Sequence, residues 1–147
     1  MARVKLFFPD TAPLFSCTLP IRITDINYGN HLANDAVLSL LHEARVQLLA
    51  SWGFSEMNAG GNGLIMGDVM IAYKSEAFYG EILVADLFCE EISSRGFDLL
   101  YRLKAIRSGQ WADVAHAKTG MVCYDYTTRK ITAMAEVLKS RLSGIGI

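Results

Sequence analysis

The sequence predicts an α+β domain in which a five-stranded antiparallel sheet wraps around one long central helix. Residues 34–52 place apolar side chains at helical spacing, which predicts the helix. Four later segments alternate apolar and polar residues, which predicts strands. The turns between these segments are short, as in an antiparallel meander. At 147 residues the chain is most simply one domain, spanning 1–147.

Before the helix, residues 14–24 form the first predicted strand, in which Pro20 indicates an edge position or a bulge. The helix has one apolar stripe, made of Val37, Leu40, Leu41, Ala44, Leu48 and Trp52. Further apolar residues lie off this stripe, at Leu38, Val46 and Leu49. Because the helix is apolar on more than one side, we expect other structure to wrap around it. Gly53 suits its C-terminal end.

The four later strands are expected at 64–75, 81–92, 96–107 and 110–126. The third alternates most clearly, with one face formed by Phe97, Leu99, Tyr101, Leu103 and Ala105. A short terminal helix is possible within 132–142. Two copies of such a sheet can pair edge to edge into one longer sheet.

Composition excludes several classes of protein. The net charge is −1 and the sequence has no block of Lys and Arg, so we expect no nucleic-acid binding. No window approaches the ~18 uncharged apolar residues of a membrane span, and the apolar patch near the N-terminus is too short for a secretory signal. The mean hydropathy of +0.25 is high for a small soluble monomer. We therefore predict a cytoplasmic homo-oligomer, a dimer or a tetramer.

Cysteine and histidine patterns point to no cofactor. Cys17, Cys89 and Cys123 are odd in number and far apart, so they suit neither a disulfide framework nor a CxxC metal site. We expect three reduced, buried thiols. Nothing in the spacing of His42, Glu43 and His116 requires a metal ion.

The densest polar chemistry lies just before the helix, in residues 22–35, RITDINYGNHLAND. A helix N-terminus has unpaired N–H groups and the positive end of the helix dipole, which suit a developing negative charge. Asn34 and Asp35 also suit the helix start itself, as N-cap and first-turn acid. Asp25 alone is compatible with a turn residue.

This stretch resembles a known family. Four features resemble the hotdog-fold acyl-CoA thioesterases, in particular the 4-hydroxybenzoyl-CoA thioesterase-like branch. They are the order of one strand, a helix and four strands, a D-x-[D/N] element at Asp25–Asn27, the Glu43–Arg45 triplet and the I-x-Y of Ile71–Tyr73. The resemblance covers roughly residues 15–130. Many members carry D-x-D-x-x-G-H-V-N-N. Here the register is kept by Asp25, His31 and Asn34, whereas Asn27, Asn30 and Ala33 depart from the pattern.

The resemblance implies a set of catalytic groups. Asp25 is the expected carboxylate, acting either as nucleophile on the thioester carbon or as general base for water. The backbone N–H of Leu32 is the expected oxyanion donor. His31 either orients water or the carbonyl, or is structural, and Asn34 either assists in the same way or caps the helix. Glu43 is a candidate second acid, with helix packing as the alternative.

It also implies a substrate, an acyl-CoA or acyl-carrier-protein thioester, in which coenzyme A is part of the substrate and not a cofactor. For its phosphates we expect cations at the mouth of the site, first Arg95 with Ser93 and Ser94, then Lys74. The acyl tunnel is expected between two protomers, lined by residues such as Leu41, Met66 and Met70.

Two other functions compete with hydrolysis. Hotdog enoyl-CoA hydratases and dehydratases carry D-x-N-P-x-H, but here Asp25 and His31 are six residues apart instead of five, and Tyr28 replaces the proline. A slip of one residue moves a side chain by ~3 Å, which disrupts a catalytic hydrogen bond. A non-catalytic acyl-CoA-binding module would keep the fold without the chemistry.

Overall fold

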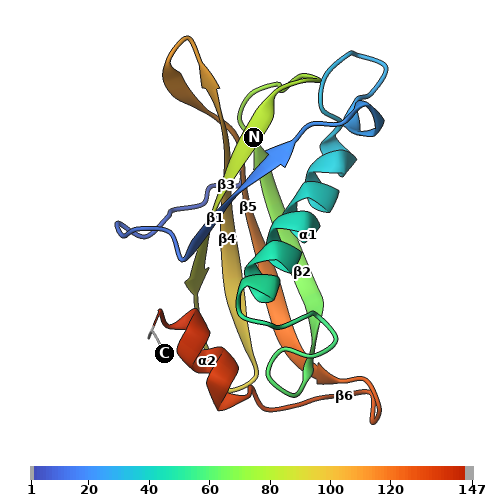
Figure 1. Ribbon diagram of the computed structural model, residues 1–147, viewed down its shortest axis with the longest axis vertical. Helices are drawn as coiled ribbons and strands as arrows, with labels where there is room; N and C mark the ends of the chain where they lie inside the picture. Colours follow the sequence, from blue (N-terminus) through green and yellow to red (C-terminus); the bar gives the residue numbers. More distant parts are fainter. Residues whose placement is uncertain (1, 145–147) are drawn as a thin grey trace.

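The computed structural model describes residues 2–144, and it shows five long strands, one long helix and short terminal elements (Figure 1). In chain order these are β1 Phe15–Pro20, the 3₁₀ turn η1 Ile23–Asp25, α1 Asn34–Ser51, β2 Gly63–Tyr73, β3 Ile82–Glu90, β4 Gly96–Arg107, β5 Gln110–Asp125, β6 Lys130–Ile131 and α2 Glu136–Leu142.

The strands form one antiparallel sheet in the order β1-β3-β4-β5-β2. The predicted count of five strands and one helix is incomplete. After β5 the chain turns back, and its two-residue β6 pairs with Tyr124 and Asp125 as a sixth strand. The second helix, α2, lies within the 132–142 segment where a short helix was expected.

The first strand is shorter than predicted. It ends at Pro20, because proline has no N–H for the ladder. The chain then enters η1, where the backbone N–H of Asp25 donates to the carbonyl of Arg22 over 2.9 Å. This early turn moves Asp25 out of the sheet and towards the start of α1.

Figure 1 shows α1 lying across one face of the sheet, and the buried side chains of the core come from this helix and from the sheet. The helix contributes its predicted stripe, of which Val37, Leu40, Leu41, Ala44 and Leu48 are buried. Opposite them, β4 contributes alternate residues, namely Phe97, Leu99, Tyr101, Leu103 and Ala105. The alternating apolar side chains of β4 and the apolar stripe of α1 therefore pack together in one hydrophobic layer.

The other face of the sheet carries charged pairs, including Lys104 with Asp86 at 2.8 Å. The N-terminal segment also packs here, since the Phe8 ring lies 5.0 Å from the His116 ring. His42 lies on α1 and contacts Glu56. His116 and His42 are thus on different layers, and the three residues considered for a metal ion do not converge.

In residues 2–144, no helix combines the length and hydropathy that a membrane span requires.

Candidate active site

Asp25 is the last residue of η1 and is 4 % exposed, which is unusual for a carboxylate. Its buried oxygens are satisfied by Arg22. The backbone N–H of Arg22 donates to Asp25 Oδ2 over 2.8 Å, Nε reaches the same oxygen at 3.4 Å, and Nη2 reaches Oδ1 at 3.3 Å. The hydrogen bond and charge of Asp25 raise the pKa of the Arg22 guanidinium, which therefore stays protonated.

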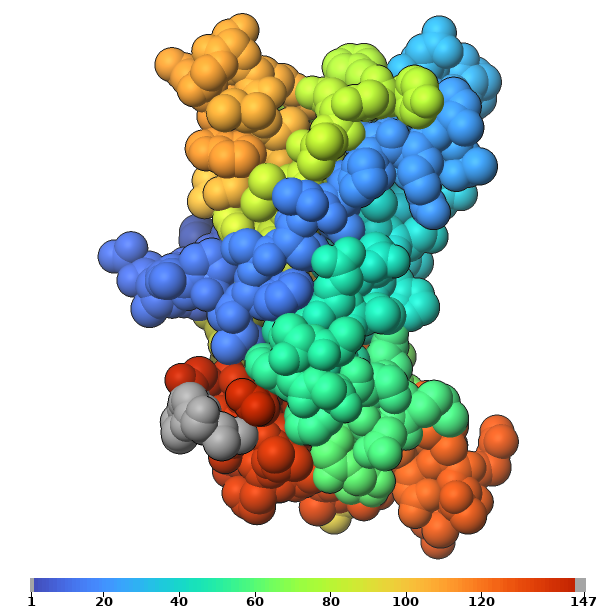
Figure 2. Space-filling model, in the orientation of Figure 1, coloured from blue at the N-terminus to red at the C-terminus, as the bar shows by residue number. Residues whose placement is uncertain are grey.

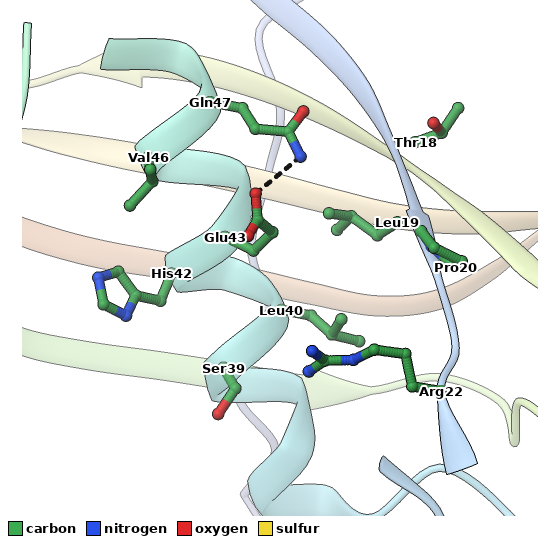
Figure 3. A pocket seen from close by; sticks show the side chains of 10 residues that line it. All are labelled: Thr18, Leu19, Pro20, Arg22, Ser39, Leu40, His42, Glu43, Val46 and Gln47. Carbon is green, nitrogen blue, oxygen red and sulfur yellow. Dashed lines mark hydrogen bonds between the residues drawn. The ribbon is translucent and has the colours of Figure 1, made fainter. Parts of the chain in front are cut away.

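A cleft of about 360 Å³ lies between β1 and α1 (Figure 3). Its apolar lining includes Leu19, Leu40 and Val46, and its polar lining includes Arg22, Ser39, His42, Glu43 and Gln47. A neighbouring pocket of about 290 Å³ is lined by Asp25, Arg22, Ser39 and the first residues of α1. The two hollows share Arg22 and Ser39, so they lie side by side. Figure 2 shows this face, on which the chain around β1 lies against α1.

The helix start provides hydrogen-bond donors beside this pocket. The Ala33 N–H donates to the Asp25 carbonyl over 2.9 Å, which ties the helix start to η1. Within residues 2–144, the backbone N–H groups of Asn34 and Asp35 have no acceptor. Asp35 also lines the pocket of Asp25. Two unpaired N–H groups therefore lie at the positive end of the helix dipole, near a buried carboxylate.

The prediction of Leu32 as oxyanion donor is wrong for this structure. Its N–H donates to the Ala77 carbonyl over 2.7 Å and is not free to meet a substrate. Asn34 is not the N-cap either. Ala33 occupies that position without a side-chain cap, and Asn34 is the first helical residue. Asp35 lies in the first turn, as expected.

Much of the remaining polar cluster builds the loop between η1 and α1. Asn27 Oδ1 accepts the Gly29 N–H over 2.9 Å, and Asn30 has a left-handed backbone with φ of 64°. Asparagine tolerates both roles. These two departures from the family pattern therefore have a local structural cause, the turn that returns the chain to Leu32.

His31 and Asn34 line a different pocket, of about 230 Å³, together with Tyr73 and Lys74. The Tyr73 hydroxyl donates to the Asn34 carbonyl over 2.9 Å, and His31 Nδ1 lies 3.2 Å from the Leu32 carbonyl. The structure thus places these residues near the helix start but does not join their side chains to Asp25.

Comparison with known protein families identifies the superfamily of this chain. The Thioesterase-like superfamily matches residues 21–142, which is most of the chain and includes Asp25 and the helix. The chain belongs to this superfamily. Its sheet and central helix form the hotdog thioesterase-like fold.

Several solved structures share this fold. A 1,4-dihydroxy-2-naphthoyl-CoA thioesterase from Synechocystis is similar, with a TM-score of 0.77, 21% identity and coverage of 88% of this chain and 95% of that chain. The probable thioesterase YbaW from Escherichia coli has a TM-score of 0.72 and 22% identity, covering 88% and 97%. A hypothetical protein from Staphylococcus aureus in complex with CoA has a TM-score of 0.79 and 16% identity, covering 94% and 87%. None of the curated proteins compared with the chain matches it.

Several residues expected around the substrate of this superfamily member lie elsewhere. Ser93, Ser94 and Arg95 form the β3–β4 turn, where the Met134 N–H donates to the Ser94 carbonyl just before α2. Figure 1 shows this turn near α2, at the end of the molecule away from the start of α1. Within one chain they cannot form the mouth of the Asp25 pocket. Lys74 does lie at the end that carries the helix start.

The residues expected to line the acyl tunnel do not lie together in the structure. Leu41 is fully buried in the core. Met66 is exposed on the edge strand β2. Met70 pairs with Lys118, whose Nζ contacts Asp68, and opposed residues of antiparallel strands point to the same side. Met70 therefore faces the side of the sheet opposite α1.

Glu43 does line the cleft, as Figure 3 shows, but its carboxylate accepts a hydrogen bond from Gln47 over 2.8 Å and makes no contact with Asp25. The side chain that pairs with the Asp25 carboxylate is that of Arg22, which lies outside the family motif. A signal was present in RITD, because an Arg three residues before an Asp can pair with it across a single turn.

Proposed function

We propose that this protein hydrolyses the thioester of an acyl-CoA to a free acid and free coenzyme A, and that Asp25 is the catalytic carboxylate. One observation carries the proposal. A buried carboxylate lies in a pocket beside unpaired helix N–H groups, and that pocket is adjacent to a cleft with a partly apolar lining. A thioester needs a base or nucleophile, a donor for the oxyanion and room for the acyl chain.

The reaction needs few groups. With Asp25 as general base, a water oxygen bonds to the thioester carbon and its proton moves to Asp25 Oδ1. The tetrahedral oxyanion accepts a hydrogen bond from the backbone N–H of Asp35, which lines the Asp25 pocket and replaces Leu32 in this role. The C–S bond then breaks, the thiolate takes a proton, and the acid leaves.

With Asp25 as nucleophile, Oδ1 bonds to the thioester carbon and displaces the thiolate. The acyl group is then bound to Asp25 as a mixed anhydride, which water hydrolyses. Labelling of Asp25 after a single turnover in H₂¹⁸O would establish the anhydride route. General-base catalysis places the label in the product acid only. Attack of water on the Asp25 side of an anhydride places label in Asp25, which peptide mass spectrometry detects.

Two relatives support the substrate class. One was solved in complex with CoA, and another acts on an aromatic acyl-CoA, 1,4-dihydroxy-2-naphthoyl-CoA. In this chain, the exposed cation Lys74 lies at the end that carries the start of α1, where the phosphates of coenzyme A would need partners. A panel of acyl-CoA esters should therefore contain aromatic as well as aliphatic acyl groups, with acyl-carrier-protein thioesters as a separate arm.

We also propose that the protein is a homodimer, or a larger assembly of dimers, formed by edge-to-edge pairing of β2. Within the described residues, this eleven-residue strand pairs on one side only, with β5. Met66, Val69 and Tyr73 are exposed along it. The other edge, β1, has six residues and ends at Pro20, so it is less suited to pairing.

The deciding experiment is thiol release from the substrate panel by the wild type and by Asp25→Asn. We expect kcat/KM of Asp25→Asn to fall by about 100-fold or more, since general-base catalysis is worth ~10²–10⁴. The matched control is Asp113→Asn, which removes a carboxylate paired with Arg102 at 3.1 Å on the other face of the sheet. This control should keep wild-type activity. An Asp25→Asn protein as active as the wild type would refute the assignment, and acyl-CoA binding without thiol release would support a binding module.

A further inference from the structure

The Asp25 carboxylate uses its acceptor positions unequally. A carboxylate has about four acceptor positions, two on each oxygen. Oδ2 receives the Arg22 backbone N–H and Nε, whereas Oδ1 receives only Nη2. Within residues 2–144 no other donor reaches this carboxylate by a hydrogen bond. Oδ1 therefore keeps one acceptor position, and Asp25 lines the pocket beside the helix start.

The backbone N–H of Arg22 alone cannot fix this arrangement. The last torsion of an aspartate side chain is broad and roughly two-fold, so a carboxylate held at one oxygen can still rotate about that contact. The guanidinium adds a second point of attachment at Oδ1, 3.3 Å from Nη2. Two attachments, one at each oxygen, define the plane of the carboxylate.

Arg22 is also placed between the two hollows of the site. It lines the cleft and the Asp25 pocket, and Figure 3 shows its side chain extending towards α1. Its side chain is 65% exposed although its partner is buried. The guanidinium contacts of 3.3–3.4 Å are long and open to solvent, so a small cation can replace this group without disturbing the core.

We propose that the Arg22 guanidinium is the positioning residue of the hydrolysis proposed above: it orients the Asp25 carboxylate so that Oδ1 is the working oxygen. This inference rests on the proposed function. Arg22 does not act on the substrate itself; it acts through Asp25. A lysine at this position supplies charge but no fork that spans both oxygens, so charge alone does not replace it.

The test exploits the fact that every Arg22 variant keeps the backbone N–H bond to Oδ2. For Arg22→Ala we expect kcat to fall by up to about 100-fold, the cost of a misplaced catalytic group, with little change in KM. Guanidinium chloride, added far below denaturing concentrations, should restore part of kcat. Arg22→Lys should stay well below the wild type.

The matched control is Arg102→Ala, which also removes an arginine paired with an aspartate, Asp113. It should keep wild-type kcat and not respond to guanidinium. Three results would overturn the inference: an Arg22→Ala protein with unchanged kcat, a defect confined to KM, or a kcat defect that guanidinium does not relieve.

A crystal structure of Arg22→Ala tests the same point without any substrate. We expect the Asp25 carboxylate to rotate or to occupy more than one orientation, and an unchanged carboxylate would overturn the inference. If the wild type released no thiol from any member of the panel, the proposed hydrolysis would fail, while the crystallographic comparison would still decide whether Arg22 orients Asp25.

Discussion

A carboxylate that is 4 % exposed needs hydrogen-bond donors from the protein itself. Within residues 2–144, the hydrogen bonds that the Asp25 carboxylate accepts all come from Arg22, three positions earlier. Local sequence thus determines the position of the carboxylate, since Arg22 and Asp25 belong to the same turn. In the proposed mechanism the oxyanion donor lies outside this turn, at the start of α1, where Asp35 lines the same pocket as Asp25.

The three cysteines lead to a prediction at the same scale. Burial, with smaller contributions from nearby carboxylates, raises the pKa of Cys17 to about 11 and that of Cys89 to about 12, and burial also raises the pKa of Cys123. Only the thiolate reacts with disulfide reagents, and its fraction is small near pH 8 when the pKa lies several units higher.

We therefore expect slow modification of the native protein by DTNB (5,5′-dithiobis(2-nitrobenzoic acid)) near pH 8, with a rate that rises about tenfold per pH unit up to the pKa. The unfolded protein should react rapidly, because the raised pKa values depend on the fold. Stopped-flow absorbance measures both rates. A native thiol that titrates near pH 7 would contradict the prediction, and it would also complicate thiol-release assays.

At the scale of elements, Arg45 connects α1 to the sheet. Its side chain is buried, donates to the Tyr101 hydroxyl over 3.1 Å and lies 3.4 Å from a Glu56 carboxylate oxygen. The Tyr101 hydroxyl in turn lies 2.7 Å from the Thr119 hydroxyl, so one polar chain crosses from the helix to β4 and β5. The buried charge is compensated by the Tyr101 hydroxyl and the Glu56 carboxylate, although Arg45 Nε itself has no hydrogen-bond partner within residues 2–144.

Arg45→Ala should lower the free energy of unfolding by about 3–5 kcal/mol, since it removes one member of a buried charged network and leaves a cavity. Arg45→Met should cost less, because it refills the space and Glu56, which is half-buried, can still be hydrated. Urea unfolding followed by circular dichroism measures both changes. As a control, the exposed Arg95→Ala should change stability by less than about 0.5 kcal/mol. Equal effects of Arg45→Ala and Arg95→Ala would show that the network contributes little.

At the scale of the whole molecule, the apolar composition and the open β2 edge point to self-association. Val69 is 38% exposed near the middle of this edge strand. We expect the wild type to sediment as a dimer or larger species and Val69→Glu to shift it towards monomer, because a charge would then meet its symmetric copy or an apolar surface. Analytical ultracentrifugation measures the change.

The control for this prediction is Ile106→Glu, which introduces the same charge at an exposed β-branched residue near the end of β4. This variant should keep the wild-type oligomeric state. A monomeric wild type, or an equal effect of the two variants, would refute pairing through β2.

Periodicity was a sufficient guide to most elements. The helix of 34–52 and the strand of 96–107 were predicted within one residue of α1 and β4, because each has a regular apolar face that the core requires. The first strand was predicted too long, since its alternation continues past Pro20 although its backbone pairing does not. The two-residue β6 has no periodicity of its own and exists only because β5 is beside it.

The features of the candidate site likewise fall into those that the sequence predicts and those that depend on the tertiary structure. The sequence by itself determined the family resemblance, the helix that forms the core and Asp25 as the carboxylate to test, because motif and periodicity are properties of consecutive residues. Only the tertiary structure decided which N–H groups are free, that Leu32 is bonded to Ala77, that His31 and Asn34 line a different pocket, and that the β3–β4 turn lies far from Asp25. Hydrogen bonds between distant segments settle these points, and such bonds depend on how the segments pack in space.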